Sequence, residues 1–360
     1  MLENLLLMYK SLQAVRAGAA LLVVLFHIGA TMALEKYFGV SVLSTYFSFG
    51  DAGVEIFFVL SGFIIYHAHK SDIAVPHRLA GYVWKRLTRV YPVYWIVFFL
   101  VYLAVLVIPS LAGKVPHDFG RIIQSLLLLP QNKEVVGGTG AAVLVVAWSL
   151  QYEIVFYIYF AIMIVNIWVA LAIGFGMLVV YFSCSMIFPC GFPLSFISAD
   201  YMLLFGMGVA LSWLHNSRFP IKHPMSLAFA GISLFTWLAF DEIWQINFFI
   251  EGRTLLYGAA GALLILGFAR TELEGRIIGG QQWLQLLGNS SYSLYLIHFP
   301  LISILCKLLV ITGFHRLGLG GVLFSFLMIL MICVMCAVLF HVWVERPLMF
   351  LLRRKVGEGI

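Results

Sequence analysis

The sequence predicts an all-α, polytopic integral membrane protein with about ten transmembrane helices. Hydrophobic residues make up 62% of its 360 residues and charged residues only 11%, and the mean hydropathy is +1.01. Soluble domains carry about 25% charged residues. The apolar runs are continuous and do not alternate with polar residues, which favours helices over a β-barrel.

Ten apolar runs have the composition of transmembrane helices. We expect them at about residues 12–33, 52–68, 90–109, 146–164, 167–188, 197–214, 225–240, 254–269, 291–311 and 319–342. The first run is longer than the apolar part of a typical signal peptide, so we expect it to be a span. We expect one transmembrane domain over 1–360, with no appended soluble domain.

The basic residues predict the orientation of the chain. An even number of spans places both termini on one side, and lysines and arginines concentrate in the cytoplasm. Cytoplasmic termini put about two thirds of the 22 lysines and arginines on that side, and we predict this orientation. Two connections are longer than hinges: a cytoplasmic loop at 69–89 and an external loop at 110–145.

Arg16 and His27 lie eleven residues apart in the first predicted span. At about 100° and 1.5 Å per residue, they share one helical face and are separated by about 16 Å along the axis. An ionisable side chain at that depth is costly without a partner or a water-filled cavity, so it is a functional candidate by default. We predict that His27 is catalytic.

Two carboxylates arrive at a similar predicted depth. Glu55 lies near the outer end of the second span, and Glu153 lies near the start of the fourth. A carboxylate beside an imidazole orients it for general-base catalysis, so we predict that both act with His27. The alternative for each is an interfacial acid that faces water.

Arginines gather at the opposite, cytoplasmic end of the predicted bundle. Arg16 enters the first span, and Arg86 and Arg89 enter the third. The guanidinium group is a forked donor suited to phosphate, which predicts a pocket for a polyphosphorylated cofactor. The alternative is that these arginines only set the topology.

Tyr295 and His298 lie in the ninth span, with His298 about a third of the way from the cytoplasmic side. We place both with the cofactor. The alternative for His298 is a core histidine bonded to a neighbouring helix.

We predict no metal site. His67 and His69 are separated by one residue, and Cys333 and Cys336 by two, but neither pair has a second set of ligands nearby. The two histidines are expected to face solvent or headgroups, and the two cysteines to be small core residues.

Six motifs occur in order along the chain. They are the Arg16–His27 pair, GVEIFFVLSGF at 53–63, KRLTRVYPVYW at 85–95, AWSLQYEIVFY at 147–157, SYSLYLIH at 291–298 and VERPL at 344–348. Together they resemble the membrane-bound acyltransferase 3 family over nearly the whole chain. The opening residues are most similar to the exopolysaccharide O-acetyltransferase branch.

The resemblance implies O-acyl transfer, in particular O-acetyl transfer, from cytoplasmic acyl-CoA to a hydroxyl of a cell-surface or exopolysaccharide sugar. It implies three groups of residues: His27, Glu55 and Glu153 for catalysis; Arg16, Arg86 and Arg89 for acetyl-CoA; and Trp148 and Ser149 for the acceptor. To these we add Tyr295 and His298 for acetyl-CoA and Asp51 for the acceptor. His27 acts either as a general base or through an acyl-histidine, and the sequence leaves both routes open.

The same resemblance implies a location in the bacterial cytoplasmic (inner) membrane. The expected partners are acyl-CoA, a polysaccharide or lipid-linked oligosaccharide, the lipid bilayer and the polysaccharide export machinery. Nucleic acid is not expected, because the net charge of +6 suits loops that face anionic headgroups. The alternative functions are a proton-coupled transporter or flippase of a lipid-linked glycan, with His and Glu as a proton relay, and a non-catalytic assembly partner.

Overall fold

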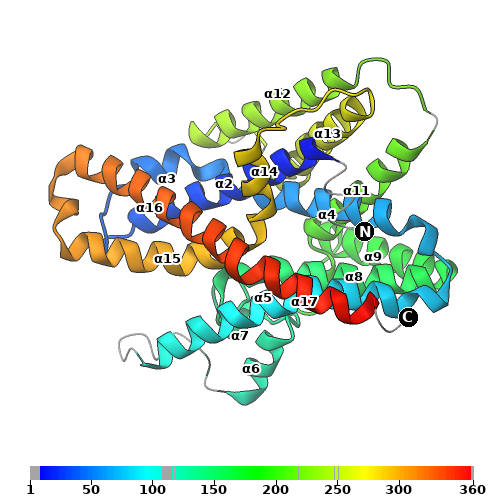
Figure 1. Ribbon diagram of the computed structural model, residues 1–360, viewed down its shortest axis with the longest axis horizontal. Helices are drawn as coiled ribbons and strands as arrows, with labels where there is room; N and C mark the ends of the chain where they lie inside the picture. Colours follow the sequence, from blue (N-terminus) through cyan, green and yellow to red (C-terminus); the bar gives the residue numbers. More distant parts are fainter. Residues whose placement is uncertain are drawn as a thin grey trace. The chain divides into compact units, whose positions relative to one another are not determined.

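The computed structural model describes residues 9–107, 116, 118–217, 219–246, 248, 249 and 251–357, with side chains described up to residue 352. Throughout these residues the regular secondary structure is helical (Figure 1). The predicted all-α class is therefore confirmed. Residues 1–8 and 358–360, which hold the two ends predicted to be cytoplasmic, lie outside the described residues.

Ten helical segments of the described chain are long and apolar enough to cross a membrane, which confirms the predicted number. They are Lys10–Met32, Ser48–Asp72, Pro76–Val107, Val145–Val165, Ile167–Met186, Leu194–Asn216, Pro224–Ile243, Arg253–Leu273, Ser291–Ile311 and Gly318–Leu352. The chain is a multi-pass membrane protein.

The chain folds into two compact units, which are described separately. Unit 1 is Met1–Ala68 with Leu204–Trp343, and unit 2 is His69–Leu203 with Val344–Ile360. The principal helices of unit 1 are α2 (Lys10–Met32), α3 (Val42–Tyr46), α4 (Gly53–His69, except its last residue), α11 (Asp200–Asn216, from Leu204), α12 (Pro224–Ile243), α13 (Arg253–Leu273), α14 (Gln282–Asn289), α15 (Ser291–Ile311) and α16 (Gly318–Phe340). Those of unit 2 are α5 (Leu79–Val107), α6 (Phe119–Leu126), α7 (Lys133–Val136), α8 (Trp148–Val165), α9 (Ile167–Met186), α10 (Leu194–Ile197) and α17 (Arg346–Gly357).

Helix α2 forms the core of unit 1 together with α15 and α16 (Figure 1). Ala17, Ala20 and Val24 follow the three- and four-residue spacing of one helical face and are fully buried. The two alanines let the neighbouring helices approach closely. The polar residues of α2 are thereby held against fixed neighbours.

Helices α4 and α11 cross at two glycines. A Cβ atom on Gly62 would overlap the carbonyl oxygen of Phe205, and one on Gly208 would overlap that of Val59. The two backbones are therefore in direct contact, an arrangement typical of small residues in membrane helices.

Unit 2 departs from the predicted cytoplasmic loop at 69–89. After α4 the chain makes two short 3₁₀ turns, Lys70–Asp72 and Pro76–Arg78, and α5 already begins at Leu79. Lys85, Arg86 and Arg89 therefore lie within α5. The sequence prediction started the third span after these charged residues. No proline precedes Pro92 within α5, so the helix can begin earlier than predicted.

Aromatic residues of α5 anchor the connection that follows it. Tyr91, Tyr94 and Trp95 donate hydrogen bonds of 2.8, 2.7 and 2.9 Å to the carbonyl oxygens of Leu127, Ser125 and Leu126, respectively. These carbonyls lie at the C-terminal end of α6 and in the residue that follows it, where carbonyl groups lack a full set of helical partners. Part of the predicted 110–145 loop is thus helical; its residues 110–115 and 117 lie outside the described residues.

A disulfide bond joins Cys184, near the end of α9, to Cys190 in the turn beyond it. No motif in the sequence predicts this bond. Of the two cysteines expected to be small core residues, Cys333 is free and buried in unit 1 and Cys336 is free and partly buried; Cys306 is also free and buried.

The glycine crossing gives a test of this packing. We expect Gly208→Ala to lower the free energy of unfolding by about 1–3 kcal/mol, because the added methyl group must push the α4 backbone away. Gly206→Ala, in the same helix, is the matched control, since a Cβ there meets nothing within 4 Å. Thermal unfolding in detergent measures both, and equal stability of the two variants would contradict the close crossing.

Candidate active site

His27 is fixed by its own helix. Its Nδ1 lies 2.8 Å from the carbonyl oxygen of Val23, one turn earlier in α2. A carbonyl oxygen only accepts hydrogen bonds, so Nδ1 carries the hydrogen. In the neutral ring, Nε2 then holds the free lone pair, which is what a general base requires.

His298 of α15 is the polar side chain packed against this imidazole. Its Nε2 lies 3.3 Å from His27 Nδ1, and the ring centroids are 5.0 Å apart. His298 Nδ1 lies 2.9 Å from the carbonyl oxygen of Leu294 and therefore carries its own hydrogen. His298 Nε2 consequently accepts from His27 Nδ1–H, which reinforces the same tautomer.

This pairing places His298 differently from the prediction. We expected it about a third of the way into the membrane, near the cofactor, but it is fully buried at the depth of His27. Tyr295, one turn earlier in α15, lies 5.9 Å from His298 and 6.3 Å from Phe57, centroid to centroid. Tyr295 and His298, both from the SYSLYLIH motif, therefore lie near His27 and not, as predicted, with the donor arginines.

Glu55 does not form the expected hydrogen bond to His27. Its side chain is 7% exposed, and its Oε2 atom is buried without a hydrogen-bond partner in the described part of the chain. Its electrostatic interactions are with Asp51, Arg253 and Glu242. The carboxyl group thus belongs to a different polar cluster of unit 1.

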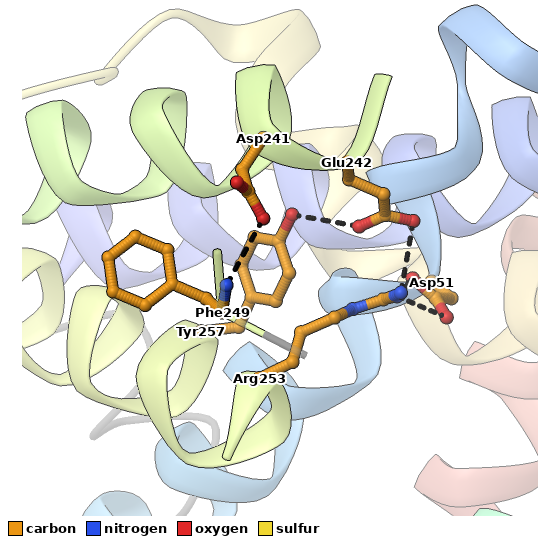
Figure 2. A network of polar contacts seen from close by, with 6 residues as sticks. All are labelled: Asp51, Asp241, Glu242, Phe249, Arg253 and Tyr257. Atoms are coloured by element: carbon orange, nitrogen blue, oxygen red, sulfur yellow. Dashed lines mark hydrogen bonds and ion pairs between the residues drawn. The ribbon is translucent and has the colours of Figure 1, made fainter. Parts of the chain in front are cut away.

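That cluster surrounds Arg253, the first residue of α13 (Figure 2). Arg253 Nη2 lies 2.8 and 2.9 Å from the two carboxylate oxygens of Asp51, and Nη1 lies 3.1 Å from Glu242 Oε1. Tyr257 donates a 3.1 Å hydrogen bond to the other oxygen of Glu242. Below, the Arg253 cluster means Asp51, Glu242, Arg253 and Tyr257.

The sequence analysis placed only Asp51 of this cluster at the site. Arg253 and Glu242 looked like ordinary charges at span ends. One feature of the sequence could have indicated this cluster. The connection between the two predicted spans is short, and it has two acidic residues at one end and an arginine at the other.

At the other end of the face, Arg16 is 9% exposed and donates a 3.2 Å hydrogen bond to Gln13. Gln13 in turn donates to Asn289, which ends α14, at 2.8 Å. These two hydrogen bonds connect the guanidinium group of Arg16 to the neutral amide of Gln13 and, through it, to that of Asn289.

Arg86 is the most enclosed of the predicted arginines, at 4% exposure in unit 2. It lies over the rings of Tyr82 and Tyr157, and donates at 3.4 Å to His69 Nε2. His69 donates at 2.7 Å to Asp72 and is 1% exposed, so the expectation that it faces solvent is wrong. Arg86 Nε has no hydrogen-bond partner among the described residues.

Arg89 differs, because its Nη1 forms a 2.9 Å ion pair with Glu345. Glu345 is 1% exposed and belongs to the VERPL motif. The pair joins α5 to the residue that directly precedes α17. Both residues belong to unit 2. The contact gives Arg89 a structural partner that the sequence analysis did not identify.

The other predicted residues of unit 2 lie in the first turns of α8. Glu153 accepts a 2.5 Å hydrogen bond from Tyr157. Ser149 donates to the carbonyl oxygen of Val146, and the Trp148 ring lies 5.0 Å from that of Tyr201. Tyr157 therefore contacts both predicted groups of this unit, Glu153 and Arg86.

An apolar cavity of about 300 Å³ lies between α2, α4, α12 and α13. Its α2 lining includes Val15, Gly18 and Leu22, which point about 140° away from Arg16 and His27. It has no charged lining residue and suits neither phosphate nor sugar. In the described residues there is also no group of three or more His, Cys, Asp or Glu side chains suited to a metal ion.

Comparisons with known proteins agree with the motif pattern. A family profile described as "Acyltransferase domain" matches residues 9–341. The chain is 27% identical over 336 residues to the exopolysaccharide production protein ExoZ of Rhizobium meliloti (strain 1021), covering 88% of this chain and 95% of that protein. No solved structure matches. The chain belongs to the membrane-bound acyltransferase 3 family and is an acyl-transferring enzyme.

Proposed function

We propose that the protein is an O-acetyltransferase that moves an acetyl group from acetyl-CoA to a sugar hydroxyl of an exopolysaccharide or its lipid-linked precursor. The acyltransferase family and the name of the Rhizobium relative support this reaction class and acceptor. The observation that carries the proposal is the His27 pair: two backbone-anchored imidazoles that leave Nε2 of His27 as a base.

The chemistry requires one proton acceptor at the reacting hydroxyl. His27 Nε2 takes the hydroxyl proton while the sugar oxygen bonds to the thioester carbonyl carbon. The carbon–sulfur bond then breaks, and the CoA sulfur leaves as thiolate and receives the proton. A relay through acyl-His27 uses the same nitrogen.

Arg86 supports binding of the anionic donor. A buried guanidinium group is costly without an anion, and in the described residues no carboxylate contacts Arg86 directly. A CoA phosphate is such an anion. Arg16, held by Gln13 on the face of His27, is a second phosphate ligand in this proposal.

The disulfide supports cytoplasmic termini in a bacterial inner membrane. Disulfide bonds persist in oxidising compartments such as the periplasm. With the N-terminus in the cytoplasm, the fifth span, α9, ends on the outer side, where Cys184 and Cys190 are paired. The acceptor hydroxyl would then be acetylated from that side.

The central test is His27→Ala in cells that lack the native copy of the gene. We expect the acetyl ester content of the exopolysaccharide to collapse, because loss of a general base slows transfer by about 10²–10⁴-fold. His223→Ala, an exposed histidine at the start of α12, is the matched control. NMR of the polysaccharide measures the esters; normal acetylation by a His27→Ala protein present at wild-type level would refute the role.

Binding of CoA to purified protein tests the donor site. We expect Arg86→Ala to weaken binding about 10-fold or more, because a hydrogen bond to a charged group contributes about 1.5–3 kcal/mol. Arg78→Ala, an exposed arginine of the same unit, is the control. Titration calorimetry measures both, and wild-type affinity in Arg86→Ala would remove this residue from the site.

Thiol labelling tests the orientation. After treatment of intact spheroplasts with a membrane-impermeant phosphine, we expect a membrane-impermeant maleimide to label Cys184 and Cys190, identified by peptide mass spectrometry. Without the phosphine neither is labelled, and Cys184→Ser/Cys190→Ser is the control. Labelling that appears only after the membrane is broken would reverse the orientation.

A further inference from the structure

We propose that the Arg253 cluster, with Glu55 beneath it, binds the acceptor sugar, and that Arg253 and Glu242 set its affinity. This inference rests on the proposed function and adds Arg253 and Glu242, residues that neither the motifs nor the comparisons single out, to the predicted acceptor residue Asp51.

The cluster is assembled from three elements of unit 1. Asp51 lies in the 3₁₀ turn before α4, Glu242 in the last turn of α12, and Arg253 at the first position of α13 (Figure 2). Asp241 fixes the connection between α12 and α13, because its carboxylate accepts from the backbone N–H groups of Phe248 and Phe249 at 3.1 and 3.4 Å. The charged groups are thereby held in place before any ligand arrives.

Burial within the cluster increases inward. The side chains of Asp51 and Arg253 are 40% and 37% exposed, that of Glu242 is 15% exposed, and Glu55 is 7% exposed. Glu55 interacts electrostatically with all three, and its Oε2 atom has no hydrogen-bond partner among the described residues. A buried acceptor left unsatisfied costs about 1–3 kcal/mol, so a ligand that donates a hydrogen bond gains there.

The chemistry of the cluster selects a polyol. Three carboxyl groups surround one guanidinium group, so acceptors of hydrogen bonds outnumber donors. Sugar hydroxyls donate to carboxylates, and Arg253 supplies donors to hydroxyl oxygens. A phosphate or another anion would be repelled, because the carboxylates of Asp51 and Glu242 already outnumber the single guanidinium group of Arg253.

The cluster also lies close to the His27 helix. Gly50, next to Asp51, packs so tightly on α2 that an added Cβ would lie 3.0 Å from Cβ of Phe26 and would overlap the carbonyl oxygen of Leu22. Phe26 precedes His27 directly. The cluster therefore lies beside α2 at the level of His27, which is consistent with an acceptor bound near the proposed base.

The test separates acceptor binding from donor binding. Purified protein in lipid nanodiscs is given radiolabelled acetyl-CoA as donor. The acceptor is either base-deacetylated exopolysaccharide or a lipid extract that contains lipid-linked saccharides. Both acceptors come from the strain that carries the protein. We expect Glu242→Gln and Arg253→Met to raise the KM for the acceptor about tenfold or more, with the KM for acetyl-CoA unchanged. Arg253→Lys should recover part of the affinity, since it restores the charge but not the fork.

Arg316→Met is the matched control, because Arg316 is an exposed arginine of the same unit, outside the cluster. Two results would overturn this inference and leave the proposed function standing. One is an acceptor KM that is unchanged in Glu242→Gln and in Arg253→Met. The other is an equal rise in the KM values for acceptor and for acetyl-CoA, together with a lower melting temperature. A wild-type protein that acetylates neither acceptor would overturn both.

Discussion

A histidine in a membrane helix has few hydrogen-bond partners, and those of His27 define the site. Its Nδ1 bonds to the carbonyl oxygen of Val23, and His298 is anchored in the same way to Leu294. Each ring therefore depends on the regular backbone of its own helix. Because α2 and α15 pack together through a common apolar core, the two anchored rings meet at a fixed distance. Among the described residues, His27, the base of the proposed reaction, is thus oriented by a backbone carbonyl and a second imidazole, with no hydrogen bond to a carboxylate.

Separating the carboxyl groups from the imidazole has a chemical consequence. A carboxylate hydrogen-bonded to His27 would place a negative charge beside the imidazole, whereas the imidazole of His298 orients the ring without adding a full charge. Glu55 is instead directed to Arg253, Asp51 and Glu242. One unit therefore holds the paired imidazoles and a separate, acid-rich cluster, which suits the proposed division between proton transfer and acceptor binding.

The spans could be predicted from the sequence because the thickness of the bilayer fixes helix length and apolarity. The shared face of Arg16 and His27 follows from helical periodicity alone. The partner of His27 could not be predicted, because the contact with His298 joins residues 271 positions apart and depends on how two helices pack. Arg253 and Glu242 were missed for a related reason: a charge at the end of a span is ordinary until the fold places it beside other charges.

The KRLTRVYPVYW motif combines residues with clear structural contacts and one arginine to which we assign a binding role. Arg86 lies over two tyrosine rings and donates to His69, while its Nε has no hydrogen-bond partner among the described residues; in the proposed function a phosphate of the donor supplies the anion. Arg89, one turn later, already has Glu345, a residue from the far end of the sequence. Tyr91, Tyr94 and Trp95 then fix the end of α6. The charged half of the motif therefore contains one arginine paired with a buried carboxylate and one that we propose binds the anionic donor, a distinction that spacing alone does not show.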